Sequence, residues 1–151
     1  MKKQKGLSIP NKKAKFNYEF IETYDAGIIL VGTEIKSIRE GKVSFSDSFC
    51  YIHDEEVFLK NLHISEYDLG NINNHDPLRV RKLLLNKDEI LKLKKKSEEK
   101  GLTIVPVKIY INDRNLAKVI IALAKGKKQH DKRNTIKERE IERNLKRDFN
   151  I

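Results

Sequence analysis

The chain has 151 residues, of which 36% are charged and 38% hydrophobic, and its formal net charge is +10. This length suits one domain, and the single cysteine, Cys50, excludes an internal disulfide framework and a four-cysteine zinc site. The longest apolar runs, 28–31 and 119–124, are too short to span a bilayer, and no apolar segment follows the basic N-terminus as in a secretory signal. We therefore expect a soluble cytoplasmic protein that makes no membrane contact.

The positive charge lies at the two ends of the chain. Residues 1–15 carry six lysines and no acidic residue, residues 125–151 carry ten basic and five acidic residues, and the stretch between them has a net charge of −1. Basic extensions on a nearly neutral body are typical of proteins that bind RNA or DNA, because lysine and arginine displace counterions from phosphates. Two alternatives are lysine-rich ends that only improve solubility and, less favoured because no obvious Trp/Phe/Leu face is present, ends that bind an anionic membrane surface. We expect a folded domain over 1–124 and a basic tail over 125–151.

The first half of the body predicts short strands and one helix. Alternation of Phe16, Tyr18 and Phe20 with polar residues predicts two strands over 16–31, with a break at 25–27. Thr33 is expected to cap a short helix over 34–40, which Gly41 would end. Further strands are expected at 49–53, 57–61 and 63–65, and breakers make 66–78 irregular.

The second half predicts one helix and two longer strands. Asn86 and Glu89 fit a capping box, so a helix should begin there, with Ile90, Leu91 and Leu93 on its apolar face. Strands are expected over 103–111, with a kink at a proline, and over 116–124. This pattern favours a mainly β fold, namely a small, partly open, OB-like antiparallel barrel with short helices. The tail has only a thin apolar stripe, so we expect it to be disordered when free and helical when bound.

Signals for catalysis or metal binding are weak. The four histidines lack the spacing of a zinc-binding helix, and no glycine-rich phosphate loop occurs. His75 and Asp76, with Arg79 and Arg81 nearby, could serve a metal-dependent nuclease, but a structural or RNA-contacting role is favoured. Cys50 is expected to be a buried small hydrophobe. We predict no catalytic residue, no metal and no cofactor.

Three basic clusters predict contacts with RNA. The segment 11–18 interleaves lysines with Phe16 and Tyr18, a pairing used for phosphate contact and base stacking, although core positions are favoured for the two aromatics. Arg79 and Arg81 would share one side of an extended segment and could grip adjacent phosphates. The third cluster, 125–133, is a dense basic run at the end of the last predicted strand.

In this order, the motifs resemble those of the SsrA-binding protein (small protein B) family of bacterial trans-translation. The matching segments include Asn-Lys-Lys-Ala at 11–14, Ala-Gly-Ile at 26–28 with 32–42 after it, Ser-Asp-Ser at 46–48, His-Asp-Pro at 75–77, Arg-Lys-Leu-Leu-Leu-Asn at 81–86 and Gly-Lys-Lys-Gln-His-Asp-Lys-Arg at 126–133. The resemblance implies an OB-like barrel with a basic tail that binds the tRNA-like domain of transfer-messenger RNA (tmRNA) and accompanies it to stalled ribosomes. It also implies a non-enzymatic role, and we expect a monomer in solution.

The resemblance places Tyr24, Asp25, Glu34, Lys36, Leu84 and Asn86 on the surface that faces the tRNA-like domain. The basic clusters and their neighbours add Asn11, Lys12, Arg39, Arg79, Arg81, Lys82, Lys125, Lys127 and Lys128. Carboxylates such as Glu34 can accept hydrogen bonds from base amino groups or 2′-hydroxyls, but this side chain could equally cap its own helix.

The resemblance places the tail in the decoding region of the small ribosomal subunit, where it stands in for the missing codon–anticodon helix. The residues expected to act there are His130, Asp131, Lys132, Arg133, Lys137 and Arg139. The alternative function is that of a generic OB-like protein that binds structured RNA or associates with the ribosome.

Overall fold

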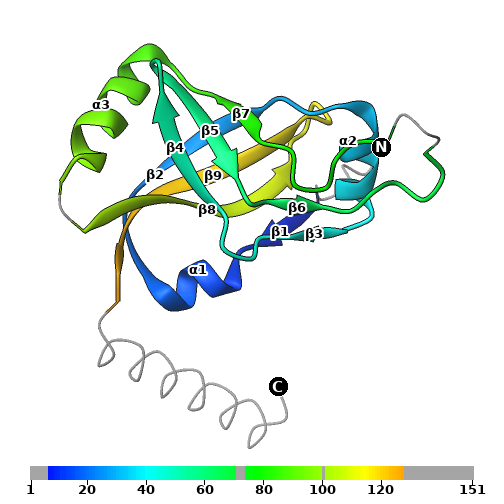
Figure 1. The fold of residues 1–151 in the computed structure, drawn as a ribbon, viewed down its shortest axis with the longest axis horizontal. Coiled ribbons are helices and arrows are strands. Elements are labelled where there is room, and N and C mark those ends of the chain that lie inside the picture. The colour runs from blue at the N-terminus through cyan, green and yellow to red at the C-terminus, as the bar shows by residue number, and fades with distance from the viewer. Residues whose placement is uncertain (1–6, 71–73, 100, 128–151) are drawn as a thin grey trace, which may run out of the picture.

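The computed structural model describes residues 7–70, 74–99 and 101–127, which form an antiparallel β-barrel with helices on its outside (Figure 1). The helices are α1 (Lys12–Asn17), α2 (Gly32–Arg39) and α3 (Lys87–Ser97). The strands are β1 (Ser8–Pro10), β2 (Tyr18–Ile28), β3 (Val43–Ser44), β4 (Phe49–His53), β5 (Glu56–Lys60), β6 (His63–Ile64), β7 (Arg81–Leu84), β8 (Leu102–Ile111) and β9 (Ala117–Gly126).

The barrel closes because β8 pairs with strands on both of its edges. The strand order is β8-β4-β5-β7-β2-β9, and β9 returns to β8, with every pair antiparallel. The seam between β4 and β8 contains one residue pair, Cys50 with Ile104, whereas β1 pairs farther along the same edge of β8. The expected partial opening of the barrel corresponds to this short seam.

Aliphatic side chains fill the barrel. Ile38 of α2, Leu83 of β7, Leu93 of α3 and Ile121 of β9 have no or almost no exposed surface and belong to one cluster. Complete burial of one such side chain contributes roughly 1.5–3 kcal/mol. The prediction of a mainly β fold built on a small antiparallel barrel with short helices is therefore confirmed. Within the part of the chain that the structure describes, no helix is long and apolar enough to cross a membrane.

The predicted break at 25–27 is wrong, because β2 runs without interruption through these residues. Asp25, Ala26 and Gly27 pair with Ile120, Val119 and Lys118 of β9. The irregularity of β2 is instead a register shift between residues 20 and 22. An Asp-Ala-Gly sequence favours a turn in isolation, but here hydrogen bonds to β9 keep it extended.

Residues 12–17 form helix α1 rather than the start of a strand. Asn11 is the N-cap, and its side chain accepts a hydrogen bond from the Ala14 N–H at 3.1 Å. The same side chain donates to the Pro106 carbonyl at 2.8 Å, so the cap also fixes α1 to β8. The local alternation of aromatic residues concealed this capping signal.

The two predicted helices are present, with differences at particular residues. The N-cap of α2 is Val31, not Thr33, and the Glu34 carboxylate accepts the Val31 N–H at 2.9 Å. The α3 capping interaction is present, since the Asn86 N–H donates to Glu89 at 3.1 Å. Leu91, predicted to be on the apolar face, is 55% exposed.

The remaining strand predictions agree closely with the structure. The strands predicted at 49–53, 57–61, 103–111 and 116–124 correspond to β4, β5, β8 and β9, and the register of β8 shifts just after Pro106. The short strands β1, β3 and β7 were not predicted. Strand β9 continues to Gly126, two residues beyond the predicted domain boundary.

Candidate nucleic-acid interface

A buried ion-pair network joins α2 to β7 and the segment before it. Glu34 has no exposed surface, and its two carboxylate oxygens accept hydrogen bonds from Arg79 Nη2 at 2.6 Å and from Arg81 Nε. Arg81 is also fully buried and donates to the carbonyls of Leu62 at 2.7 Å and Pro77 at 3.2 Å. The two arginines share one side of their segment, as predicted, but they grip a carboxylate rather than phosphates.

This network corrects two of the predicted RNA contacts. The prediction that Glu34 and Arg81 bind RNA is wrong for this structure, because neither side chain reaches the surface. Of the two readings of Glu34, the structure supports the capping of α2. Arg79 remains partly exposed, with about a third of its side-chain surface accessible, so it alone of the two arginines can also face a ligand.

His75 belongs to the same buried region. Its Nδ1 lies 2.8 Å from the Thr33 hydroxyl and its Nε2 lies 2.8 Å from the Ile64 carbonyl. A carbonyl can only accept, so Nε2 carries a proton, and in the neutral ring Nδ1 accepts from the Thr33 hydroxyl. Both ring nitrogens are therefore engaged in holding the loop. No group of three metal-binding side chains occurs among the described residues.

Stability should depend on pH through Glu34. Burial raises the pKa of this carboxyl, but hydrogen bonds from Arg79 and the Val31 N–H and the charge of Arg81 outweigh burial, so its pKa lies below the ordinary 4.5. A lowered pKa in the folded state stabilises the protein above pH 4.5, and the contribution is lost as the pH falls toward the folded pKa. At pH values below 4.5 we expect the free energy of unfolding, measured by urea titration, to decrease as the pH is lowered. This decrease should be steeper in the wild type than in Glu34→Gln, by up to about 1.4 kcal/mol per pH unit.

Asp25 and Leu84 lie on the outer face of the barrel. Leu84 of β7 pairs with Gly27 of β2 and is 52% exposed. A Cβ atom at Gly27 would lie only 3.2 Å from the Leu84 Cβ, so the glycine leaves room for this side chain to lie against the strand. Asn86 follows two residues later, is exposed, and precedes α3. The structure thus brings together Asp25, Leu84 and Asn86, three of the predicted contacts.

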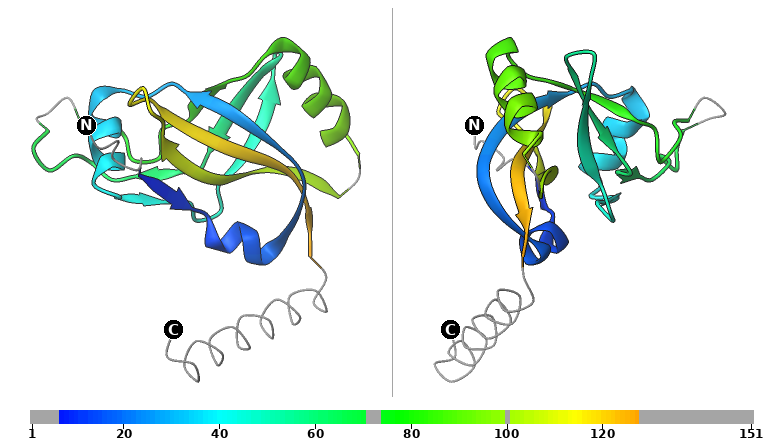
Figure 2. Two further views of the ribbon diagram at one scale, coloured as in Figure 1. Left: turned by 180° about the vertical axis from the view of Figure 1, so that it is seen from behind. Right: turned by 60° about the vertical axis from the view of Figure 1, so that its left-hand side comes forward.

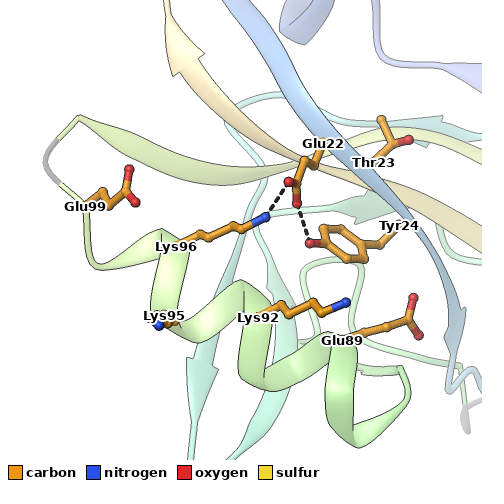
Figure 3. A pocket seen from close by; sticks show the side chains of 8 residues that line it. All are labelled: Glu22, Thr23, Tyr24, Glu89, Lys92, Lys95, Lys96 and Glu99. Atoms are coloured by element: carbon orange, nitrogen blue, oxygen red, sulfur yellow. Dashed lines mark hydrogen bonds and ion pairs between the residues drawn. The ribbon is translucent and has the colours of Figure 1, made fainter.

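Tyr24 lies next to this face, in a cleft of about 780 Å³ between β2 and α3 (Figure 3). Its hydroxyl donates to Glu22 at 2.7 Å, and Glu22 also forms an ion pair with Lys96 of α3. Burial, followed by the hydrogen bond to Glu22, raises the pKa of Tyr24 to about 12, so its hydroxyl stays a donor at neutral pH. Since the ring also packs against the core, Tyr24 helps to hold α3 on the barrel.

The other predicted contacts lie at different places on the barrel. Lys36 and Arg39 are exposed on α2, and Lys36 lies over the ring of Tyr67 at 5.4 Å. Lys82 of β7 forms an ion pair with Glu56 at 2.9 Å.

Lys12 of α1 and Lys125 of β9 are exposed at a third place, where the Lys127 N–H donates to the Asn17 carbonyl at 2.8 Å. Helices α1 and α2 lie on different sides of the barrel (Figure 1). Asn11 is buried as the cap of α1, so its predicted RNA contact is wrong for this structure.

The predicted tail contacts lie outside the described residues. These are Lys128, His130, Asp131, Lys132, Arg133, Lys137 and Arg139. The expected helix of the bound tail lies outside them as well.

Sequence reasoning missed two residues that touch a predicted contact. Asp25 accepts a hydrogen bond from the Tyr110 hydroxyl at 2.8 Å and forms an ion pair with Lys118 at 3.3 Å. The three residues come from β2, β8 and β9, so only the strand register brings them together. The alternation of β8 and β9 could have placed Tyr110 and Lys118 on the outer face, but not beside Asp25.

Comparisons with known proteins agree along nearly the whole chain. The family model described as "SmpB protein" matches residues 8–151. An SsrA-binding protein of Phocaeicola vulgatus is 54% identical over 143 residues, which are 95% of each chain, and one of Thermosipho africanus is 58% identical over 135 residues, 89% of this chain and 91% of the relative. A solved structure described as "tmRNA-SmpB: a journey to the center of the bacterial ribosome" has 52% identity and a TM-score of 0.70, over 81% of this chain and 85% of that one.

Proposed function

Because this chain belongs to the SmpB protein family, we propose that it binds the tRNA-like domain of tmRNA and delivers it to stalled ribosomes for trans-translation. The match to the family model from residue 8 to the C-terminus carries this conclusion, since it includes both the barrel and the basic tail. The similar solved structure, which pairs SmpB with tmRNA on the ribosome, supports the same partners. Since its proposed partner is the bacterial ribosome, we also propose a cytoplasmic location.

The outer face around Asp25, Leu84 and Asn86 is the surface proposed to hold the tRNA-like domain. Leu84 offers an apolar contact to a ribose or base, and Asp25 offers an acceptor to a 2′-hydroxyl or a base amino group. Structured RNA exposes these groups in its wide, shallow minor groove and in its loops. The chemistry of this face therefore fits recognition of a folded RNA by its shape and its hydroxyl groups.

Lysines and arginines outside this face are proposed to add phosphate contacts. They are Lys12, Lys36, Arg39, Arg79, Lys82, Lys125, Lys127 and Lys128. Such contacts fix the position of the RNA without reading its sequence. The tail beyond them is proposed to occupy the decoding region. We propose no catalytic step for this chain.

Removal of Leu84 and Asn86 together tests the proposed surface. The double variant Leu84→Ala with Asn86→Ala should bind the tRNA-like domain about 30- to 150-fold more weakly, since an apolar contact and a polar contact are each worth roughly 1–1.5 kcal/mol. Affinity would be measured by gel shift at constant salt, because RNA affinity depends on ionic strength.

Leu69→Ala is the matched control, because Leu69 is an exposed leucine in the loop after β6, outside the proposed surface. This variant should bind like the wild type. Equal affinities of the double variant and this control would show that the outer face is not the binding surface.

A further inference from the structure

We propose that the RNA surface extends from Asp25 across β9 to β8, where Lys108 and Lys118 contact phosphates and Tyr110 positions the Asp25 carboxylate. This inference rests on the proposed function and names the protein groups that complete the same surface. Strands β2, β9 and β8 run side by side on one face of the barrel (left view of Figure 2). In that view no described helix lies over this face.

The strand register arranges the outward side chains in two rows. In one row, Tyr110 of β8 pairs with Lys118 of β9, which pairs with Gly27 of β2, which pairs with Leu84 of β7. In the adjacent row, Lys108 pairs with Ile120, which pairs with Asp25. Asp25 therefore stands in the second row and reaches across to Tyr110 and Lys118 in the first. Tyr110 and Lys118 therefore lie in the same cross-strand row as Leu84.

The Asp25 carboxylate is held from two sides. Oδ1 accepts the Tyr110 hydroxyl at 2.8 Å, and Oδ2 lies 3.3 Å from the Lys118 ammonium. Each oxygen can accept more than one hydrogen bond, and 47% of the side-chain surface is exposed, so acceptor capacity remains on the solvent side. A carboxylate fixed in this way can meet an RNA hydroxyl or amino group without losing further rotamer freedom.

Tyr110 is suited to position Asp25 at every physiological pH. Burial, followed by its hydrogen bond to Asp25, raises the pKa of Tyr110 to about 12. The hydroxyl therefore remains protonated and keeps donating. Lys108 lies over the ring of the same tyrosine at 5.5 Å, which steadies the lysine by a cation–π contact.

The charges of this group favour the RNA backbone. Lys118 pairs with the Asp25 carboxylate, and Lys108 lies over the ring of Tyr110. The Lys118 ammonium has three hydrogens, only one of which is needed for Asp25. Lysines beside an aromatic ring on an open sheet are the combination that binds ribose–phosphate chains. We therefore infer that the remaining donors of Lys108 and Lys118 bind phosphate oxygens.

The salt dependence of binding tests the two lysines. Affinity of the full chain for a transcript of the tRNA-like domain would be measured from ~50 to ~200 mM salt, and Lys108→Gln and Lys118→Gln should each lower the slope of log affinity against log salt by about 0.7–0.9. Lys60→Gln, the same change at an exposed lysine of β5, is the matched control and should keep the wild-type slope. Unchanged slopes in both lysine variants would overturn the inference.

The role of Tyr110 needs a different readout. Tyr110→Phe removes only the hydroxyl and should weaken binding about two- to tenfold, while the salt slope stays that of the wild type. In an Asp25→Ala background the same substitution should cause no further loss, because the carboxylate that it positions is gone. A full additional loss in that background would show that Tyr110 does not act through Asp25.

The outcomes separate this inference from the proposed function. A wild-type chain that binds bulk tRNA as tightly as the tRNA-like domain contradicts the proposed function, whatever the variants do. A wild-type chain with the expected preference, but with unaltered slopes in the two lysine variants, contradicts only the inference. Binding of the variants to isolated small ribosomal subunits should remain that of the wild type, and a loss confined to the subunits would assign the surface to ribosomal RNA instead.

Discussion

Glu34→Gln is expected to lower the free energy of unfolding by about 3–5 kcal/mol, the cost of removing one partner from a buried ion pair. The variant leaves Arg81, which has no exposed surface, without its carboxylate, and it removes the partner of Arg79 as well. A charged guanidinium in the interior then lacks the compensation that its burial requires. Urea unfolding at pH 7 would measure the loss.

Asp47→Asn is the matched control for this prediction. It makes the same change from carboxylate to amide in an exposed ion pair, between Asp47 and Lys13 at 2.8 Å. Exposed pairs contribute roughly 0–1 kcal/mol, so this variant should unfold nearly as the wild type does. Equal losses in both variants would contradict the role assigned to the buried network.

Truncation before Lys132 is expected to abolish tagging on stalled ribosomes and to leave the affinity for the tRNA-like domain largely unchanged. The described barrel ends with β9 at Gly126 and a backbone hydrogen bond from Lys127 to Asn17, so every described residue lies before the truncation point. The missing residues include most of the segment proposed to occupy the decoding region. Tagging would be measured in a reconstituted translation system, and RNA affinity by gel shift.

The truncation also tests the division into barrel and tail. Comparable losses of tagging and of RNA affinity would contradict it, because one surface would then serve both partners. A truncated chain that still supports tagging would contradict the role of the tail. The melting curve of the truncated chain should coincide with that of the full chain, since all described residues of the barrel are retained.

The sequence was sufficient to predict those elements whose signals are local. Strand β4 was predicted with its exact bounds, and the capping residues Asn86 and Glu89 located the start of α3. Strand β2 was misjudged at 25–27, because an Asp-Ala-Gly sequence favours a turn until β9 supplies its hydrogen-bond partners. Helix α1 was missed for a related reason, since its cap Asn11 is completed by a bond to Pro106, 95 residues away.

The sequence could predict which residue types form the site, but not which of their side chains are buried or which neighbours they contact. The spacing of Arg79 and Arg81 correctly placed both on one side of the chain, yet only the fold shows that Glu34 lies on that side. In the sequence of an RNA-binding protein, Glu34, Arg79 and Arg81 are expected at the surface. Their burial depends on the packing between α2 and β7, which the sequence does not show. Tyr110 and Lys118 could not be linked to Asp25 without the strand register.

Selective binding of tmRNA can be measured by titrating the full chain against the tRNA-like domain of tmRNA by gel shift, at ~0.15 M salt and with bulk tRNA as competitor. We expect the complex to survive excess competitor, because the outer face recognises a particular folded RNA and the lysines only add to its affinity. Displacement by bulk tRNA at equal concentration would show that the outer face does not select tmRNA, and the chain would then be a generic structured-RNA-binding barrel.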